Sequence, residues 1–135
     1  MAARFVSVGS YTVALGCRSV RTLVFEGKPS EHRARDVVIQ ISAFIECRGV
    51  DDDPDDAGHR VHVYFLRPES DLPEPYYAEE ARAATIYVPE AHYPWYRDLL
   101  RHEQEVYASL FSDKPFRNCL CTGSDVIGLG DTSIR

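Results

Sequence analysis

Apolar and polar residues alternate with a period of two in several short stretches of this chain, and this pattern constrains its fold more than any other feature. The clearest examples are residues 36–47, 60–66, 84–88 and 106–111. Successive side chains of a β-strand point to opposite faces, so alternation is typical of strands with one buried and one solvated face. Such strands commonly form antiparallel sheets.

The predicted core positions are apolar and recur at every second residue. They are Val37, Ile39, Ile41, Ala43 and Ile45 in the first stretch, Val61, Val63 and Phe65 in the second, and Ile86 and Val88 in the third. We expect each of these sets to face one hydrophobic core.

Polar segments separate the predicted strands. Residues 49–59, which include the acidic run 51–56, are too polar to bury and should join 36–47 and 60–66 into a long antiparallel hairpin. Residues 67–80 hold three prolines and five acids and predict a loop. Nearer the N-terminus, residues 4–8 and 11–15 are two short strands or one bent strand, and residues 20–26 form another.

One principal helix is predicted over about residues 93–103, because Pro94 suits a first helical turn. Val106, Tyr107 and Leu110 keep a helical spacing, so this helix could continue to Leu110. The same region also alternates, and residues 112–115 have the composition of a turn. We therefore favour an antiparallel hairpin of 105–111 with 116–122.

Together these elements predict an α+β fold with a mostly antiparallel, twisted sheet of six or seven strands that could curl toward a barrel. The length of 135 residues is that of one domain. We place this domain over residues 1–122. Residues 123–135, which are rich in Gly, Ser, Asp and Thr, should be a mobile C-terminal tail.

Charge and hydropathy argue against nucleic-acid and membrane partners. The formal net charge of −6 opposes binding to a phosphate backbone, and polar residues interrupt every apolar run that could cross a membrane. The N-terminal residues lack the continuous apolar core of a secretion signal. The four cysteines suit a reducing cytoplasm, where they would be free thiols without a disulfide.

No metal or cofactor signature is present in the sequence. The aspartates of residues 51–56 match no register of a calcium-binding EF-hand loop, which needs Gly at the sixth and Glu at the twelfth position. Cys119 and Cys121 are too closely spaced for a usual zinc site. Neither glycine-rich nucleotide fingerprint occurs. We expect no metal and no cofactor.

Catalytic candidates are few. Asp98 and His102 are four residues apart on the predicted helix, and a carboxylate–imidazole pair can orient a general base. The same spacing is common in surface pairs. With His62 and His92 they would be the acid–base groups of a small hydrolase or isomerase-like enzyme, whose site would lie between loop 67–80 and the helix start.

The outer face of the sheet carries more aromatic surface than a protein normally leaves in water. Its predicted binding residues are Phe44, Tyr64, Tyr87, Tyr107 and Phe111. The Trp95 helix, a second subunit or a ligand could cover them. We therefore interpret the chain as a non-catalytic binding or assembly protein that acts through this face, with a protein partner or as a homodimer. A small-molecule ligand, and an acidic partner-mimic that uses residues 51–56, are the alternatives.

Overall fold

The computed structural model describes residues 3–26, 33–51, 53–102, 105–111, 118–122 and 125–126. Its elements are β1 (Ala3–Glu26), β2 (Arg33–Gly49), β3 (Arg60–Leu66), β4 (Tyr76–Ala78), β5 (Ala83–Pro89), the 3₁₀ turn η2 (Glu90–His92), α1 (Tyr93–His102), β6 (Val106–Phe111), β7 (Cys119–Thr122) and β8 (Asp125–Val126). The strands lie in the order β4-β5-β3-β2-β1-β6-β7-β8.

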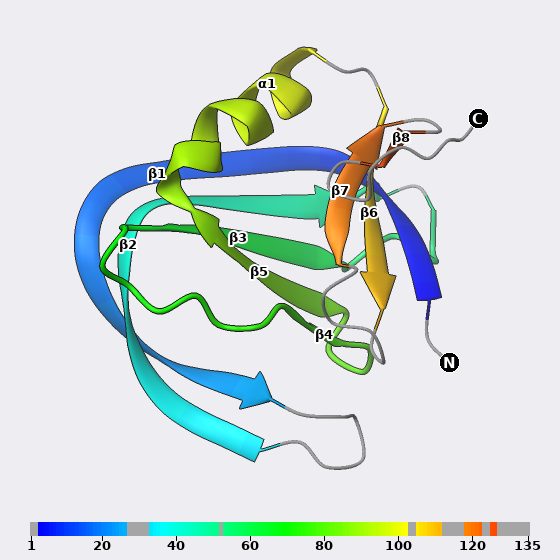
Figure 1. Cartoon of the computed structure of the whole chain (residues 1–135). Helices are drawn as coiled ribbons and strands as arrows, with labels where there is room; N and C mark the ends of the chain where they lie inside the picture. Colours follow the sequence, from blue (N-terminus) through cyan, green and yellow to red (C-terminus); the bar gives the residue numbers. More distant parts are fainter. Residues whose placement is uncertain are drawn as a thin grey trace.

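This architecture confirms the predicted α+β fold. Seven strands have three residues or more, and the two-residue β8 adds an eighth. Among the described strands only β3 and β5 run parallel. The sheet is strongly curved (Figure 1) but stays open, because β4 and β8 are its two ends.

The β1–β2 hairpin dominates the molecule. The two strands pair from Val8 and Gly49 to Glu26 and Arg33, with register shifts at Gly9 and between Leu15 and Arg18. Such bulges keep the pairing while they bend the strands. The hairpin therefore arches, and in Figure 1 its far end turns back below β4 and β5. The bent-strand alternative for the N-terminus is correct, and the segment predicted at 20–26 continues the same strand.

A bulge in β2 divides the predicted core face. Between Ile41 and Ala43 the pairing with β3 shifts by one residue, so Ser42 is the extra residue. Because directly paired residues share a face, Ala43 lies with Phe65 on one face and Ile41 with Leu66 on the other. The prediction of a single core face from Val37 to Ile45 is wrong for this reason, although the alternation on each side of the bulge is real.

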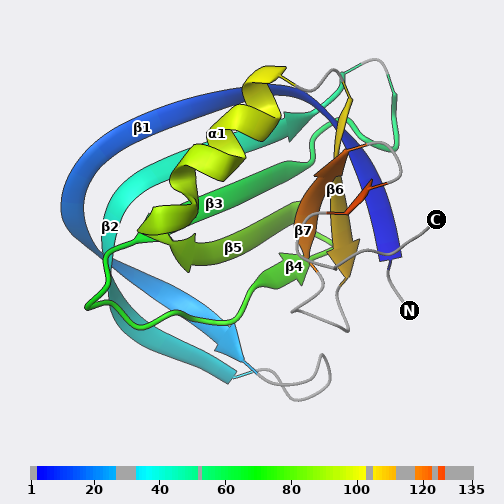
Figure 2. The ribbon, with the colours of Figure 1, turned by 45° about the horizontal axis from the view of Figure 1, so that its top comes forward.

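The main core lies between the sheet and α1, which crosses one face of the sheet (Figure 2). Phe65 is fully buried there and makes edge-to-face contacts with Tyr93 and Tyr96, with ring centroids 5.2 and 5.3 Å apart. Leu99 and Leu100 complete the buried side of the helix. The predicted helix is thus confirmed, with its apolar side formed by Tyr96, Leu99 and Leu100.

After the helix the chain forms the predicted hairpin. β6 pairs antiparallel with β7 from Val106 and Thr122 to Ser109 and Cys119, so the helix does not continue to Leu110. The predicted turn, residues 112–115, lies outside the described residues. So does the predicted tail, apart from Asp125–Val126, which pairs with β7 as β8.

The acidic segment 49–59 is partly packed, which corrects the expectation of a solvated tip. Asp56 is buried and its carboxylate accepts a hydrogen bond from the Ser7 N–H at 3.2 Å. His59 is buried too, with its Nε2 3.1 Å from the hydroxyl of Tyr77. Polar residues are buried here because each has a hydrogen-bonding partner. Tyr77 belongs to β4, a short strand within the predicted loop 67–80.

We predict that Phe65→Ala lowers the free energy of unfolding by about 3–5 kcal/mol, because it leaves a cavity beneath Tyr93 and Tyr96. Trp95→Ala is the matched control on the same helix, since Trp95 is 65% exposed, and should change stability by no more than about 0.5 kcal/mol. Urea denaturation followed by circular dichroism measures both. Equal losses would show that α1 packs differently.

Candidate binding surface

The face of the sheet opposite α1 carries four rows of side chains, whose order follows from the strand register. The first row holds Ser10, Arg48, Arg60 and Ala83; the second Thr12, Glu46, His62 and Thr85; the third Ala14, Phe44, Tyr64 and Tyr87; the fourth Arg18, Ile41, Leu66 and Pro89. We call these residues the row face. The helix packs on the other face, so the Trp95 helix does not cover the aromatic residues.

The third row is a continuous series of aromatic rings. The centroids of Phe44 and Tyr64 are 4.8 Å apart and those of Tyr64 and Tyr87 are 5.6 Å apart. His62 joins the series from the second row, 5.6 Å from Phe44. Phe44, Tyr64 and His62 are half-buried, whereas Tyr87 is only 7% exposed. Three of the five predicted binding residues are therefore brought together.

The chain itself covers the buried end of this series. Because of the bulge at Ser42, Ile39 and Ile41 point toward the row face and form a second hydrophobic cluster with Leu66 and Tyr87. Val20, from the same curved end of the hairpin, packs against this cluster. The sequence analysis did not consider this cover, because periodicity alone places the aliphatic residues of β2 on one face.

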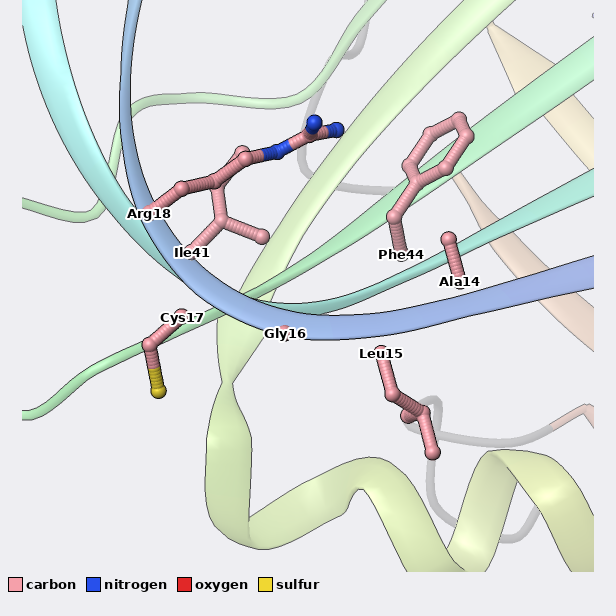
Figure 3. Close-up of a pocket in the computed structure, with 7 residues that line it drawn as sticks. All are labelled: Ala14, Leu15, Gly16, Cys17, Arg18, Ile41 and Phe44. Carbon is pink, nitrogen blue, oxygen red and sulfur yellow. The ribbon is translucent and has the colours of Figure 1, made fainter.

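A pocket of about 140 Å³ lies inside the bend of the hairpin, beside the open end of the aromatic series. It is lined by residues 14–18 together with Ile41 and Phe44. Figure 3 shows the side chains of Arg18 and Phe44 projecting to one side of β1, whereas those of Leu15 and Cys17 point to the other side. An aromatic ring and a guanidinium group thus border the same opening.

Positive charge predominates on the row face. The carboxylate of Glu46 lies 3.7 Å from both Arg48 and Arg60 and 3.6 Å from the imidazole of His62. Arg18 adds a further cation in the fourth row. This surface therefore carries three arginines against one carboxylate, in a chain whose formal net charge is −6.

The two tyrosines of the series stay protonated at neutral pH. Burial raises the pKa of Tyr64; the nearby Arg18 lowers it in part and Glu46 adds to the rise. Burial, with a smaller contribution from Tyr64, raises the pKa of Tyr87 to about 12. Both hydroxyl groups can therefore donate hydrogen bonds across the physiological range.

The remaining predicted binding residues, Tyr107 and Phe111, lie on β6, and β1 separates this strand from β2. The Tyr107 hydroxyl donates to the Glu105 carboxylate at 3.3 Å. Tyr107 and Phe111 do not belong to the row face.

The four acid–base candidates do not converge. His62 lies on the row face, whereas Asp98 and His102 are exposed on α1, on the other side of the sheet. His92 stacks on Trp95 with ring centroids 4.8 Å apart. A second cavity, of about 360 Å³, does lie between residues 66–72 and 89–91, near the expected enzyme site. None of the four candidates lines it.

No group of three potential metal ligands occurs within the described residues. No disulfide joins the four cysteines, all of which lie within the described residues; Cys17 is exposed, and Cys47 and Cys121 are buried. Within the same part of the chain, no helix is long and apolar enough to cross a membrane.

Comparison with known proteins adds no family. No protein-family model, curated protein or solved structure matches the chain.

The sequence analysis missed Arg18 as a member of the site. Arg18 stands opposite Ile41 because both strands contain an irregularity between the pairs Leu15–Ala43 and Arg18–Ile41. The only signal in the sequence was Gly16, which adopts a φ of 143° at the bend.

We predict that Tyr87→Phe flattens the loss of stability at alkaline pH. Tyrosine in the unfolded chain has a pKa of about 10, and the folded value for Tyr87 is about 12. The stabilisation is therefore complete below about pH 10 and is lost as the pH rises toward 12. The variant lacks this ionisation, so its free energy of unfolding should fall less steeply between about pH 10 and 12.

Urea denaturation at a series of pH values measures these slopes. Tyr96→Phe is the comparison variant, because burial raises the pKa of Tyr96 to about 12 as well. It should reduce the slope of the free energy of unfolding against pH by a similar amount. Identical slopes for wild type and Tyr87→Phe would contradict the burial of Tyr87.

Proposed function

We propose that the protein is a small, non-catalytic cytoplasmic binding protein that holds a segment of a partner protein on the row face and works as a homodimer. One observation supports this most directly: the half-buried pair Phe44 and Tyr64 lies beside a pocket that Arg18 borders. Aromatic residues and arginine are the side chains most enriched at the centres of protein interfaces.

The chemistry of the row face suggests the character of the partner segment. A pocket of about 140 Å³ is smaller than the roughly 300–1,000 Å³ typical of sites for drug-sized ligands. It suits one inserted side chain better than a whole small molecule. The arginines favour carboxylates, which they can bind through two parallel hydrogen bonds. The partner segment is therefore acidic and inserts an apolar or aromatic side chain.

The other predicted functions have less support. A hydrolase or isomerase needs convergent acid–base groups, and the four candidates lie apart. An acidic partner-mimic needs a cluster of exposed carboxylates. Asp51, Asp53 and Asp55 are exposed, but Asp56 is buried and Asp53 accepts the backbone N–H of Asp55 within its own turn.

The test is a titration of the protein with a fluorescently labelled peptide that contains several glutamates around one phenylalanine. Phe44→Ala and Arg18→Ala should each weaken binding by about tenfold or more, as loss of an interface hot spot does. Added salt should weaken it further. The readout is fluorescence anisotropy, and circular dichroism confirms that each variant is folded.

Arg21→Ala is the matched control. Arg21 lies three residues beyond Arg18 on β1, is highly exposed and pairs with Asp36 at 2.9 Å, so its removal should leave the affinity unchanged. A second control peptide, with alanine in place of phenylalanine, should bind more weakly. Absence of binding to the wild type, or equal binding by all variants, would refute the proposed function.

A further inference from the structure

β1 has a long open edge. On one side it pairs with β2 as far as Glu26, but on the other side β6 pairs only with Ala3–Ser7. From Gly9 onward no described strand occupies that side of β1. All residues from Thr12 to Ser19 are exposed, which is unusual for the interior of a long strand.

This edge lacks the features that normally prevent strand pairing. Native proteins protect their edges with charged residues, prolines or covering elements, because an open edge is a template for another strand. Residues 9–17 contain no charged residue and no proline, and they include Tyr11, Thr12 and Val13, which favour strands. Charge begins only at Arg18.

We propose that a second copy of this chain pairs with this edge, β1 against β1 in antiparallel orientation, around a two-fold axis at Val13. The proposal names the surface of the homodimer and rests on that part of the proposed function. In such a pair, opposite residues must share a face, so the axis passes through a residue position. Val13 is the centre of residues 9–17, the uncharged part of the open edge.

Centring on Val13 makes the edge self-complementary. Val13 meets its own copy, and Leu15 meets Tyr11 of the partner subunit on the α1 side of the sheet. Leu15 is 72% and Val13 40% exposed in the single chain, and cross-strand pairs of aromatic and aliphatic side chains stabilise a sheet.

The charges also favour this register. With the axis at Val13, residues 9–17 pair with their own copies, and Arg18 lies beyond the end of this paired stretch, past Gly9 of the partner subunit, so no arginines face each other. An axis at Arg18 would place two guanidinium groups directly opposite, and like charges in that position are destabilising. The self-complementarity of residues 9–17 is the reason to favour a second copy over an unrelated strand.

A disulfide test reports the register. Opposite residues of an antiparallel pair have Cα atoms about 4.5–5.5 Å apart, within the range that a disulfide spans. The variant Val13→Cys is made together with Cys17→Ser, which removes the exposed native thiol. When oxidised glutathione is added, two copies of this variant should become joined by a disulfide. Val38→Cys in the same background is the control. Val38 is 53% exposed on β2, away from this edge, and its variant should stay monomeric on a non-reducing gel.

Light scattering of the full chain distinguishes this inference from the proposed function. The wild type should be a dimer. Val13→Lys should be a folded monomer that still binds the acidic peptide, and Phe44→Ala should be a dimer that binds this peptide about tenfold or more weakly. A monomeric wild type, or Val13→Cys that cross-links no faster than Val38→Cys, would overturn the edge pairing. The peptide titration would still test binding at the row face, independently of the oligomeric state.

Discussion

The curvature of the β1–β2 hairpin is the constraint on which the rest of the structure depends. Both strands are far longer than the strands beside them, and a flat ribbon of that length would leave its far half in water. The irregularities at Gly9, at residues 16–17 and at Ser42 let the ribbon bend without losing its pairing. Because of this bend, both faces of the sheet are packed. Helix α1 covers one face, and the curved part of the hairpin covers part of the row face.

Much of the fold was predictable because it depends on local alternation. The bounds of β3 coincide with the alternating stretch 60–66. The helix lies where Pro94 indicated, and the β6–β7 hairpin lies on either side of residues 112–115, which have the composition of a turn. The bulge at Ser42 was not predictable in this way, because a serine there also fits an uninterrupted strand. Its effect is to reverse the face of Ile39 and Ile41, which only the pairing with β3 reveals.

The candidate site was predicted in part for a similar reason. Phe44, Tyr64 and Tyr87 came together because each lies in a regularly alternating part of its strand, with Phe44 beyond the bulge at Ser42. Tyr107 has the same local pattern, but β1 lies between its strand and β2. Neighbouring positions across a sheet depend on strand order and register, which hydrophobic periodicity does not encode. Arg18 was missed on the same grounds, since its place opposite Ile41 is set by irregularities in both strands.

The bend that covers Tyr87 also leaves the edge of β1 open. β6 is a short strand and pairs with β1 only as far as Ser7, just before the bulge at Gly9, after which β1 turns away. The same curvature therefore forms the second hydrophobic cluster, and it leaves residues 9–17 without a neighbouring strand on one edge among the described strands. Further along, Arg18 and Arg21 supply the charge that discourages strand pairing. The part of β1 without such charge is also the part in which the apolar side chains of Val13 and Leu15 are exposed, so pairing with a second copy would remove apolar surface from water.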